Sequence, residues 1–345
     1  MLLFGTTAAS MVPMQMNLVA KMNQIAIEDE HGNTILSLST DRKTATYLDV
    51  RHSSSSDTVL PNAFGLTPID SCPGATLCAA ICYAEANNWP SARAKWDVNT
   101  KFVMEKTATL EDMTKAFGLL VDGFRKLTFK KNTVEITDED GNKKKVQRDS
   151  TDKNYVPLNF RLMSSGDFPN RDCAKAWATV AKNNPDIRFW GYTRTFEVMD
   201  EFVGIKNLAI FASVDPDNRG RVDELPEGTR FAFMGSKEWA AENFPERDVR
   251  NYECPELKEK IPMYTEIGTR KRPYPEKGTT VKGAKGACAT CMLCFPTKNS
   301  GNERKNDISF VPGTFDGAGN RHEIDLEDTT SAVMVTLVGR IRQVA

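Results

Sequence analysis

The spacing of apolar residues changes several times along the chain, and each change predicts a different element. Apolar and polar residues alternate over 24–38 and 44–50, which is typical of strands with one buried face. A run of serines at 53–56 favours a loop after them. Residues 1–65 are therefore predicted to form a β-rich N-terminal segment.

Two helices are predicted next. The first begins near Pro90, because proline suits the first helical turn, and continues to about Glu105. The second begins at Thr109, whose hydroxyl can cap the unpaired amides of the first turn. Its apolar residues recur with the spacing of one helical face, which we interpret as core: Met113, Phe117, Leu120 and Phe124.

Alternation returns over 129–150 around the turn sequence Asp140-Gly141-Asn142, which predicts an inserted β-hairpin. Lysines flank this turn on both sides, and acidic residues lie among them. Such a mixture is typical of a solvated edge, so this hairpin is not expected to bind nucleic acid.

The middle of the chain alternates short apolar strands with helices. The predicted strands lie at 158–163, 187–192, 208–213 and 230–234, and the predicted helices at 171–182 and 196–202. This order favours a parallel sheet with right-handed crossovers, and the predicted fold class is α/β with a partial or complete (β/α) barrel. Functional residues of such sheets gather at the carboxyl ends of the strands. Three polar segments follow these strands: Ser164-Ser165-Gly166-Asp167, Thr193-Arg194-Thr195 and Ser213-Val214-Asp215.

The α/β core is predicted to span residues 66–250, and a cysteine-rich, metal-binding region is predicted over 251–345. This last region is rich in Lys, Gly and Pro and has few long apolar runs. A segment with so little material for a core needs another source of order, which a bound metal can supply.

Composition narrows the class of protein. A chain of 345 residues with 40% hydrophobic residues is long enough for one large domain or two ordinary ones. The 45 basic and 46 acidic residues nearly cancel, so no global field attracts nucleic acid or an acidic membrane. No apolar run approaches the roughly 18 residues of a membrane span, and the first residues lack the basic start of a signal peptide. We therefore expect a cytoplasmic protein, in which the 8 cysteines are poor candidates for disulfides.

Three cysteines lie close together in a loop that enters a helix: Cys72, Cys78 and Cys82. No histidine lies nearby in the sequence to complete a zinc site, whereas a [4Fe-4S] cluster can bind three thiolates and keep one iron open to a further ligand. We therefore predict a [4Fe-4S] cluster with an open iron. A structural zinc site completed by a distant cysteine and a redox-active disulfide are the alternatives.

A second group combines Cys254 with Cys288, Cys291 and Cys294. Thiolates at this spacing can wrap around one ion or cluster from a single loop, and Cys254 completes a set of four. We favour a second [4Fe-4S] cluster, with zinc as the alternative because four sulfurs also suit a tetrahedral ion. Cys173 lies on the apolar stripe of a predicted helix and is interpreted as a core thiol.

Several motifs occur in a fixed order along the chain: Cys72-Pro73-Gly74-Ala75-Thr76, Cys78, Cys82-Tyr83-Ala84, Ser164-Ser165-Gly166-Asp167-Phe168, Phe189-Trp190-Gly191-Tyr192-Thr193-Arg194, Ala212-Ser213-Val214-Asp215 and the segment from Cys288 to Cys294. In this order they resemble an uncharacterised bacteriophage family called gene product 88. The resemblance implies a phage-encoded protein in the cytosol of a bacterial host, and it brings no established reaction.

A looser similarity points to radical S-adenosylmethionine enzymes, which carry a three-cysteine loop after the first barrel strand and polar segments after later strands. It implies that the barrel resembles the radical S-adenosylmethionine core and that S-adenosylmethionine binds at the open iron. The implied cofactor-binding residues are Ser165, Gly166, Asp167, Arg194, Ser213 and Asp215. Asp167 and Asp215 would orient the ligand, and Arg194 would pair with its carboxylate. A helix N-cap for Asp167 and a structural ion pair for Arg194 are the alternatives.

Two functions follow from these sites, and the sequence leaves open whether the chain is an enzyme. In the first, an iron-sulfur protein performs redox or radical chemistry on a small molecule at the open iron, while the second cluster passes electrons or orders the C-terminal region. In the second, a non-enzymatic phage protein with structural iron-sulfur or zinc sites binds host protein or nucleic acid. Its contact surface would be basic: Arg270, Lys271, Arg272, Lys282 and Lys285.

Overall fold

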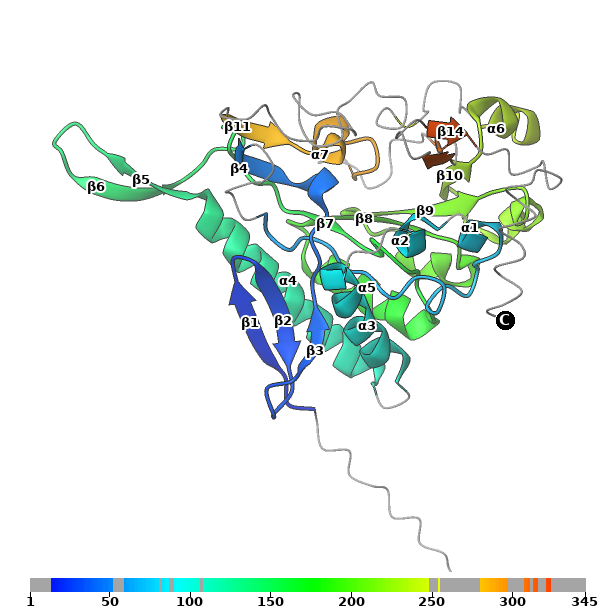
Figure 1. The fold of residues 1–345 in the computed structure, drawn as a ribbon, viewed down its shortest axis with the longest axis horizontal. Helices are drawn as coiled ribbons and strands as arrows, with labels where there is room; N and C mark the ends of the chain where they lie inside the picture. Colours follow the sequence, from blue (N-terminus) through cyan, green and yellow to red (C-terminus); the bar gives the residue numbers. More distant parts are fainter. Residues whose placement is uncertain are drawn as a thin grey trace, which may run out of the picture.

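A five-stranded parallel sheet forms the centre of the computed structural model (Figure 1). The structure describes residues 14–51, 59–80, 82–86, 90–105, 108–247, 254, 280–296, 307–310, 313–315 and 321–323. The strands lie across the sheet in the order β12 (Ile308–Phe310), β10 (Arg230–Met234), β9 (Leu208–Val214), β8 (Arg188–Thr193) and β7 (Asn159–Arg161). Most of their residues are buried, because both faces of the sheet are covered, and this explains their nearly continuous apolar sequences.

The predicted (β/α) barrel resembling the radical S-adenosylmethionine core is wrong. Within the described residues the parallel strands form an open half-barrel sheet whose edges are β7 and β12, and the other sheets are antiparallel and separate from it. An isolated parallel bridge between Ala63 and Arg161 extends the β7 edge. Alternating strands and helices predict parallel pairing between neighbours, but closure depends on the number, tilt and stagger of all strands. That information is not local, so the sequence pattern does not contain it.

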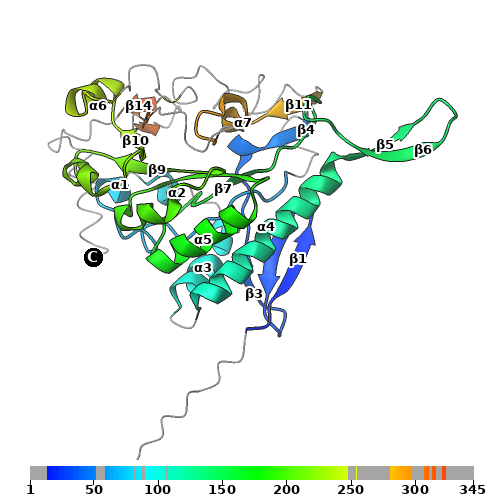
Figure 2. The ribbon, with the colours of Figure 1, turned by 180° about the vertical axis from the view of Figure 1, so that it is seen from behind.

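Three helices cover one face of the sheet: α3 (Pro90–Met104), α4 (Leu110–Asn132) and α5 (Arg171–Asn183) (Figures 1 and 2). The predicted start of α4 is confirmed, because the Thr109 hydroxyl accepts a hydrogen bond from the Asp112 amide at 3.1 Å. The Asp112 carboxylate accepts one from the Thr109 amide at 3.2 Å, which completes a capping box. All the apolar residues predicted for the core face of α4 are buried.

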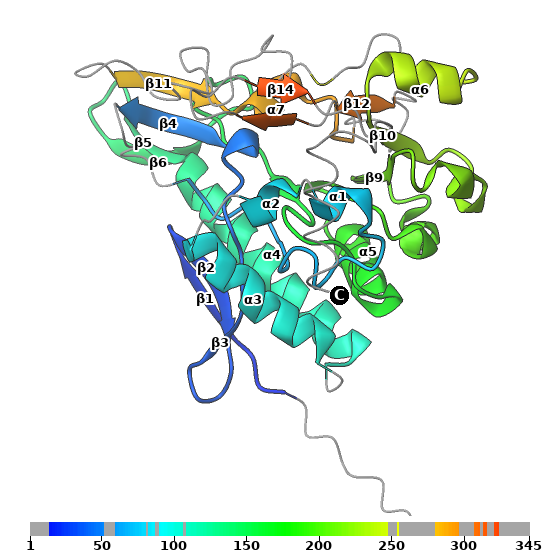
Figure 3. The same ribbon diagram turned by 45° about the vertical axis from the view of Figure 1, so that its right-hand side comes forward.

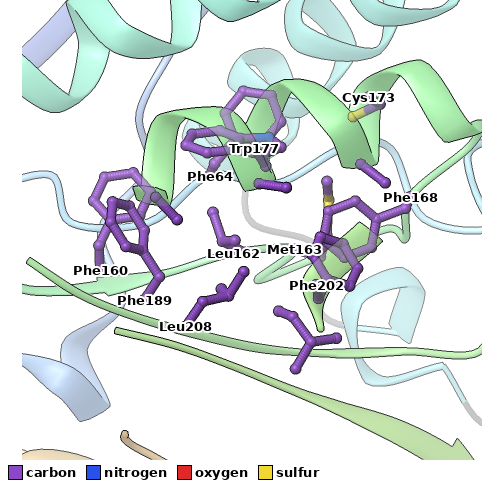
Figure 4. Packing of buried hydrophobic residues seen from close by; sticks show 14 of the residues in the cluster. Phe64, Phe160, Leu162, Met163, Phe168, Cys173, Trp177, Phe189, Phe202 and Leu208 are labelled. Carbon is purple, nitrogen blue, oxygen red and sulfur yellow. The ribbon is translucent and has the colours of Figure 1, made fainter. Parts of the chain in front are cut away.

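The largest part of the core lies between these helices and the sheet, with Trp177 of α5 at its centre (Figure 4). Its indole stacks on Phe117, with ring centroids 4.4 Å apart and ring planes 11° from parallel. Phe64 and Phe160 pack against the same indole at centroid distances of 5.1 and 5.7 Å. Cys173 is fully buried on the same helix, which confirms its interpretation as a core thiol.

The described part of the N-terminal segment contains several β-strands. Its antiparallel sheet consists of β1 (Asn17–Lys21), β2 (Gln24–Glu28) and β3 (Thr34–Ser37), and it packs against α4. Gly123 of α4 permits this contact, since a Cβ there would lie 2.9 Å from the Ile25 side chain. The serine run that predicts a loop lies outside the described residues.

The predicted hairpin is confirmed as β5 (Thr133–Thr137) and β6 (Lys143–Gln147), which project from the end of α4 away from the rest of the molecule (Figure 2). Gly141 supplies the positive φ of its turn, +84°. The exposed Glu135 of β5 forms an ion pair with Lys143 of β6 at 3.0 Å and lies opposite Lys145 in the strand register. These contacts fit the interpretation of a solvated edge.

The other face of the sheet is covered by segments from both ends of the chain (Figure 3). They are the antiparallel pair β4 (Thr46–Arg51) and β11 (Thr280–Lys285), the helix α7 (Ala287–Cys291), and the antiparallel pair β13 (Gly313–Phe315) and β14 (Arg321–Glu323). The short elements that remain are η1 (Arg42–Thr44), α1 (Leu77–Ala80), α2 (Tyr83–Ala86), η2 (Phe196–Phe202), η3 (Arg219–Glu224) and α6 (Lys237–Asn243). Hydrogen bonds between β4 and β11, and between β10 and β12, cross the predicted domain boundaries.

Candidate metal centres

Three cysteines lie in the loop and short helices that follow residue 66, and we call them the first cysteine group: Cys72, Cys78 and Cys82. The Leu66 amide donates to the Ser165 carbonyl at 2.8 Å, which places the start of this loop at the carboxyl end of β7. Gly166 permits the close approach, because its φ is +69° and a Cβ there would lie 2.4 Å from the Ser71 hydroxyl.

Arg194 joins this loop to the sheet. Its Nε donates to the Gly74 carbonyl at 2.9 Å, and its Nη2 donates to the Thr76 hydroxyl at 2.8 Å. Its Nη1 pairs with the carboxylate of Asp215, which is fully buried after β9. One guanidinium at the end of β8 therefore connects the first cysteine group with the end of a neighbouring strand.

Asp167 joins the ends of β7 and β8. Its buried carboxylate accepts hydrogen bonds from the Thr193 hydroxyl at 2.6 Å and from the amides of Arg194 and Phe168, each at 2.7 Å. Burial raises the pKa of Asp167, although these hydrogen bonds act in the opposite direction. Asn170, and not Asp167, is the N-cap of α5.

The residues predicted to bind a cofactor lie together at the carboxyl ends of three neighbouring strands, as expected for a parallel sheet. Their charged members bond to one another and to the cysteine loop: Asp167, Arg194 and Asp215. The Ser165 hydroxyl is buried and has no hydrogen-bond partner among the described residues. Ser213 is half-buried, and its carbonyl accepts a hydrogen bond from the Asn218 amide group at 2.9 Å. Their role toward a ligand stays a prediction.

Partial burial sets the electrostatics of the first cysteine group. It raises the pKa of the Cys72 thiol to about 12, and the negative charges of Asp167, Cys78 and Cys82 add to this effect. Burial also raises the pKa of Cys78, while the Arg194 guanidinium opposes the shift. Arg194, which holds this loop, thus also favours the thiolate form of Cys78.

The remaining predicted ligands form the second cysteine group: Cys254, Cys288, Cys291 and Cys294. The Cys254 amide donates to the Ser309 carbonyl of β12 at 3.0 Å, and the other three cysteines belong to α7 and the turn after it. Met292 makes this turn in the left-handed conformation, with φ of +59°. Cys254, Cys288 and Cys294 pack against an apolar cluster on β8, β9, β10 and β12 that includes Trp190 and Phe211, on the sheet face opposite α5 (Figure 3).

Tyr192 of β8 contacts this group directly. Its hydroxyl lies 3.0 Å from the Cys294 sulfur, within hydrogen-bond distance. Burial raises the pKa of Tyr192 well above its ordinary value, and the nearby thiols Cys294, Cys288 and Cys254 raise it further. Burial also raises the pKa of Cys294 to about 12 and that of Cys288 well above its ordinary value. Cys254, which is distant in sequence, thus lies with Cys288 and Cys294 near one phenol.

Sequence reasoning missed Tyr192 as a site residue, because its alternation with Trp190 on a strand is explained equally well by packing. Trp190 is 1% exposed and packs in the apolar cluster beneath the second cysteine group. The signal that could have found Tyr192 is its place two residues before Arg194, since positions i and i+2 of a strand share a face. Tyr192 on β8 contacts Cys294 of the second cysteine group, and Arg194, just after β8, contacts the loop that carries the first.

The chemistry of the side chains fits sulfur-ligated metal centres. No disulfide joins any of the cysteines, all of which belong to the described residues. Near the second cysteine group, the Trp190 indole N–H is buried without a hydrogen-bond partner in the described part of the chain. Such a donor suits a group with several acceptor atoms, for example inorganic sulfide. Within the ranges that the structure describes, no three His, Cys, Asp or Glu side chains stand ready around a single metal ion.

The basic surface of the alternative function falls largely outside the described residues, which exclude Arg270, Lys271, Arg272 and the side chain of Lys282. Lys285 is described and exposed. None of the helices in the described ranges is long and apolar enough to cross a membrane.

The fold and the two cysteine groups define an α/β protein whose sulfur-rich sites lie on an open parallel sheet. A family model described as gene product 88 matches residues 34–297, so the chain belongs to this bacteriophage family. The Gene 88 protein of Mycobacterium phage L5 is 28% identical over 267 residues, which are 75% of this chain and 93% of that protein. The Gene 88 protein of Mycobacterium phage D29 is 28% identical over 274 residues, which are 77% of this chain and 95% of that protein.

No solved structure matches the chain. The resemblance to the gene product 88 family is confirmed, while a similarity to radical S-adenosylmethionine enzymes is not shown. Membership in this family identifies a bacteriophage protein. Any reaction has to be inferred from the geometry and chemistry of the candidate site.

Proposed function

We propose that this chain is a phage iron-sulfur protein that holds one [4Fe-4S] cluster in each cysteine group. The observation that carries the proposal is geometric: Arg194 fixes the loop of the first three cysteines to the sheet, and Cys254 packs on the same apolar cluster as Cys288 and Cys294. Thiolates are the ligands of such clusters, which accept and donate single electrons when bound. Cys254 is distant in sequence from the other three cysteines of its group, and a common ligand would explain why it lies beside them.

The first cysteine group supplies three thiols, which is one fewer than a closed cluster needs. We propose that a small molecule completes the ligands of the fourth iron. Arg194 holds the loop in place through Gly74 and Thr76, and the buried Ser165 hydroxyl is a donor that a ligand can satisfy. S-adenosylmethionine is the first molecule to test. Its carboxylate would have to compete with Asp215 for the guanidinium.

The second cysteine group supplies four thiols, so its centre would have a complete set of protein ligands. We propose that it passes electrons and also orders the C-terminal region, because its cysteines link α7 to the edge strand β12. Zinc is the alternative at this group, since a tetrahedral ion takes the same donors.

The test is anaerobic purification of the full chain, followed by iron, acid-labile sulfide and zinc analysis. Two cubic clusters correspond to about eight iron per chain. Cys78→Ala should lower this to about four, because only the second centre remains. Cys173→Ala is the matched control, since its buried thiol belongs to the core, and it should keep the full iron content. A folded protein that holds only zinc, or no metal, would refute the proposal.

A second measurement addresses the open iron. Adding S-adenosylmethionine to the reduced protein should change the electron paramagnetic resonance signal of the first centre, and this change should be absent in Cys78→Ala. An unchanged signal would reject S-adenosylmethionine as its ligand. Retention on nucleic acid that falls with rising salt would favour the non-enzymatic alternative instead.

A further inference from the structure

The proposed function leaves one polar contact of the second cysteine group without a purpose. Tyr192 is partly buried and is surrounded by aromatic rings: the centroids of Trp190, Phe211 and Phe310 lie 5.6, 5.5 and 5.4 Å from its own. Its hydroxyl points to the Cys294 sulfur at 3.0 Å. Packing alone would be served as well by phenylalanine, which has the same ring and no hydroxyl to satisfy.

The direction of this hydrogen bond follows from the chemistry of a loaded centre. A thiolate bound to a metal carries no proton, so its sulfur can only accept. The Tyr192 phenol must therefore be the donor. A hydrogen bond to a charged acceptor is stronger than one between neutral groups, and its strength grows with the charge on that acceptor.

We propose that the Tyr192 hydroxyl donates to the Cys294 sulfur of the second centre and thereby raises that centre's affinity for an electron. The proposal rests on the iron-sulfur function proposed above. Reduction adds one negative charge, which the sulfur ligands share, so the hydrogen bond is stronger in the reduced state than in the oxidised state. Tyr192 is in this sense a positioning and tuning residue, because it acts through Cys294.

Tyr192 lies on a strand that is hydrogen-bonded on both sides, which supports a specific role for the contact between its hydroxyl and Cys294. The strand is held on both sides, with Trp190 opposite Ala209 of β9 and Arg161 of β7 opposite Trp190. The phenol is therefore presented from a rigid element and not from a loop. Cys294, in contrast, lies in a turn that packs onto this strand through Phe295, whose ring centroid is 5.2 Å from that of Trp190.

The experiment is a redox titration of the second centre in the full chain, with dithionite and mediators, followed by electron paramagnetic resonance. A Cys78→Ala background leaves the second centre alone to be observed. Tyr192→Phe should lower the electron affinity about tenfold, a shift of about 59 mV to more negative potential for one electron. Tyr155→Phe, which removes a hydroxyl elsewhere, is the matched control and should titrate as the parent does.

Iron content is measured on every variant, so that the outcomes remain separate. An unchanged potential in iron-loaded Tyr192→Phe would overturn the tuning role and leave the iron-sulfur function intact. Loss of the second centre's iron from this variant would also overturn it, because the hydroxyl would then be needed for retention of the cluster. A parent protein with zinc and no titratable signal would instead remove the proposed function itself.

Discussion

Replacing Arg194 with alanine is expected to release the first cysteine group from the sheet. The side chains of Arg194 and Asp215 are 7% and 0% exposed, so the variant leaves a buried carboxylate without its partner. Breaking a buried pair in this way costs about 3–5 kcal/mol. The same change removes the donors to Gly74 and Thr76, and the loop loses its attachment to β8.

Arg194→Lys separates these two effects. A lysine ammonium can still face Asp215, but it lacks the planar fork that also reaches the two loop acceptors. Each hydrogen bond from a charged donor is worth about 1.5–3 kcal/mol, part of which water returns to an accessible acceptor. We therefore expect Arg194→Lys to lose less stability than Arg194→Ala, and both variants to expose the loop more often.

The assay combines urea denaturation, which measures the free energy of unfolding, with hydrogen exchange in the loop. The reporters are the Ala75 and Ala79 amides, which donate to carbonyls within the loop at 3.0 Å each. Arg171→Ala is the control, because that side chain is 45% exposed and its ion pairs with Asp200 and Glu201 are screened by solvent, so its loss should cost much less stability than the loss of Arg194. An Arg194→Ala protein as stable as Arg171→Ala would show that the guanidinium does not hold the site.

Two further predictions concern the scaffold. Trp177→Ala should cost about 3–5 kcal/mol in urea denaturation, because it empties the centre of the core, whereas Phe129→Ala at a 62% exposed position should stay within about 0.5 kcal/mol. Equal losses would contradict the assignment of the core. Gly166→Ala should destabilise the protein by about 1–2 kcal/mol or more, because the glycine has a positive φ and a Cβ there would meet Ser71. Gly118 of α4 has open space around it, so Gly118→Ala should stabilise the protein by about 0.5–1 kcal/mol. The same sign for both glycine variants would contradict this placement of the loop.

Many elements of the fold were predictable because their causes are local. The start of α4 depends on Thr109 and Asp112, which are three positions apart, and its buried face follows from the spacing of apolar residues along one helix. The hairpin turn at Gly141 is likewise decided within a few residues. The convergence of Asp167, Arg194 and Asp215 was predictable for another reason, since residues after neighbouring parallel strands meet at one edge.

Whether the parallel sheet closes into a barrel was not predictable from the sequence. Within the described residues the sheet is open. The pairing of β4 with β11 was equally hidden, because these strands come from opposite ends of the chain and carry no complementary pattern. Tyr192 escaped notice for a related reason. A tyrosine on an apolar strand has the same local pattern whether its hydroxyl meets solvent or, as here, the sulfur of Cys294.

The sequence by itself determined the helices, the hairpin, the strand ends where polar residues collect and the two sets of cysteines, since each depends on residue types within a short window. Only the tertiary structure decided that the sheet stays open, that Arg194 holds the cysteine loop, and that thiols from two distant segments lie near Tyr192. These features depend on segments that are far apart in the chain, and their separation in space is set by the packing of the whole molecule.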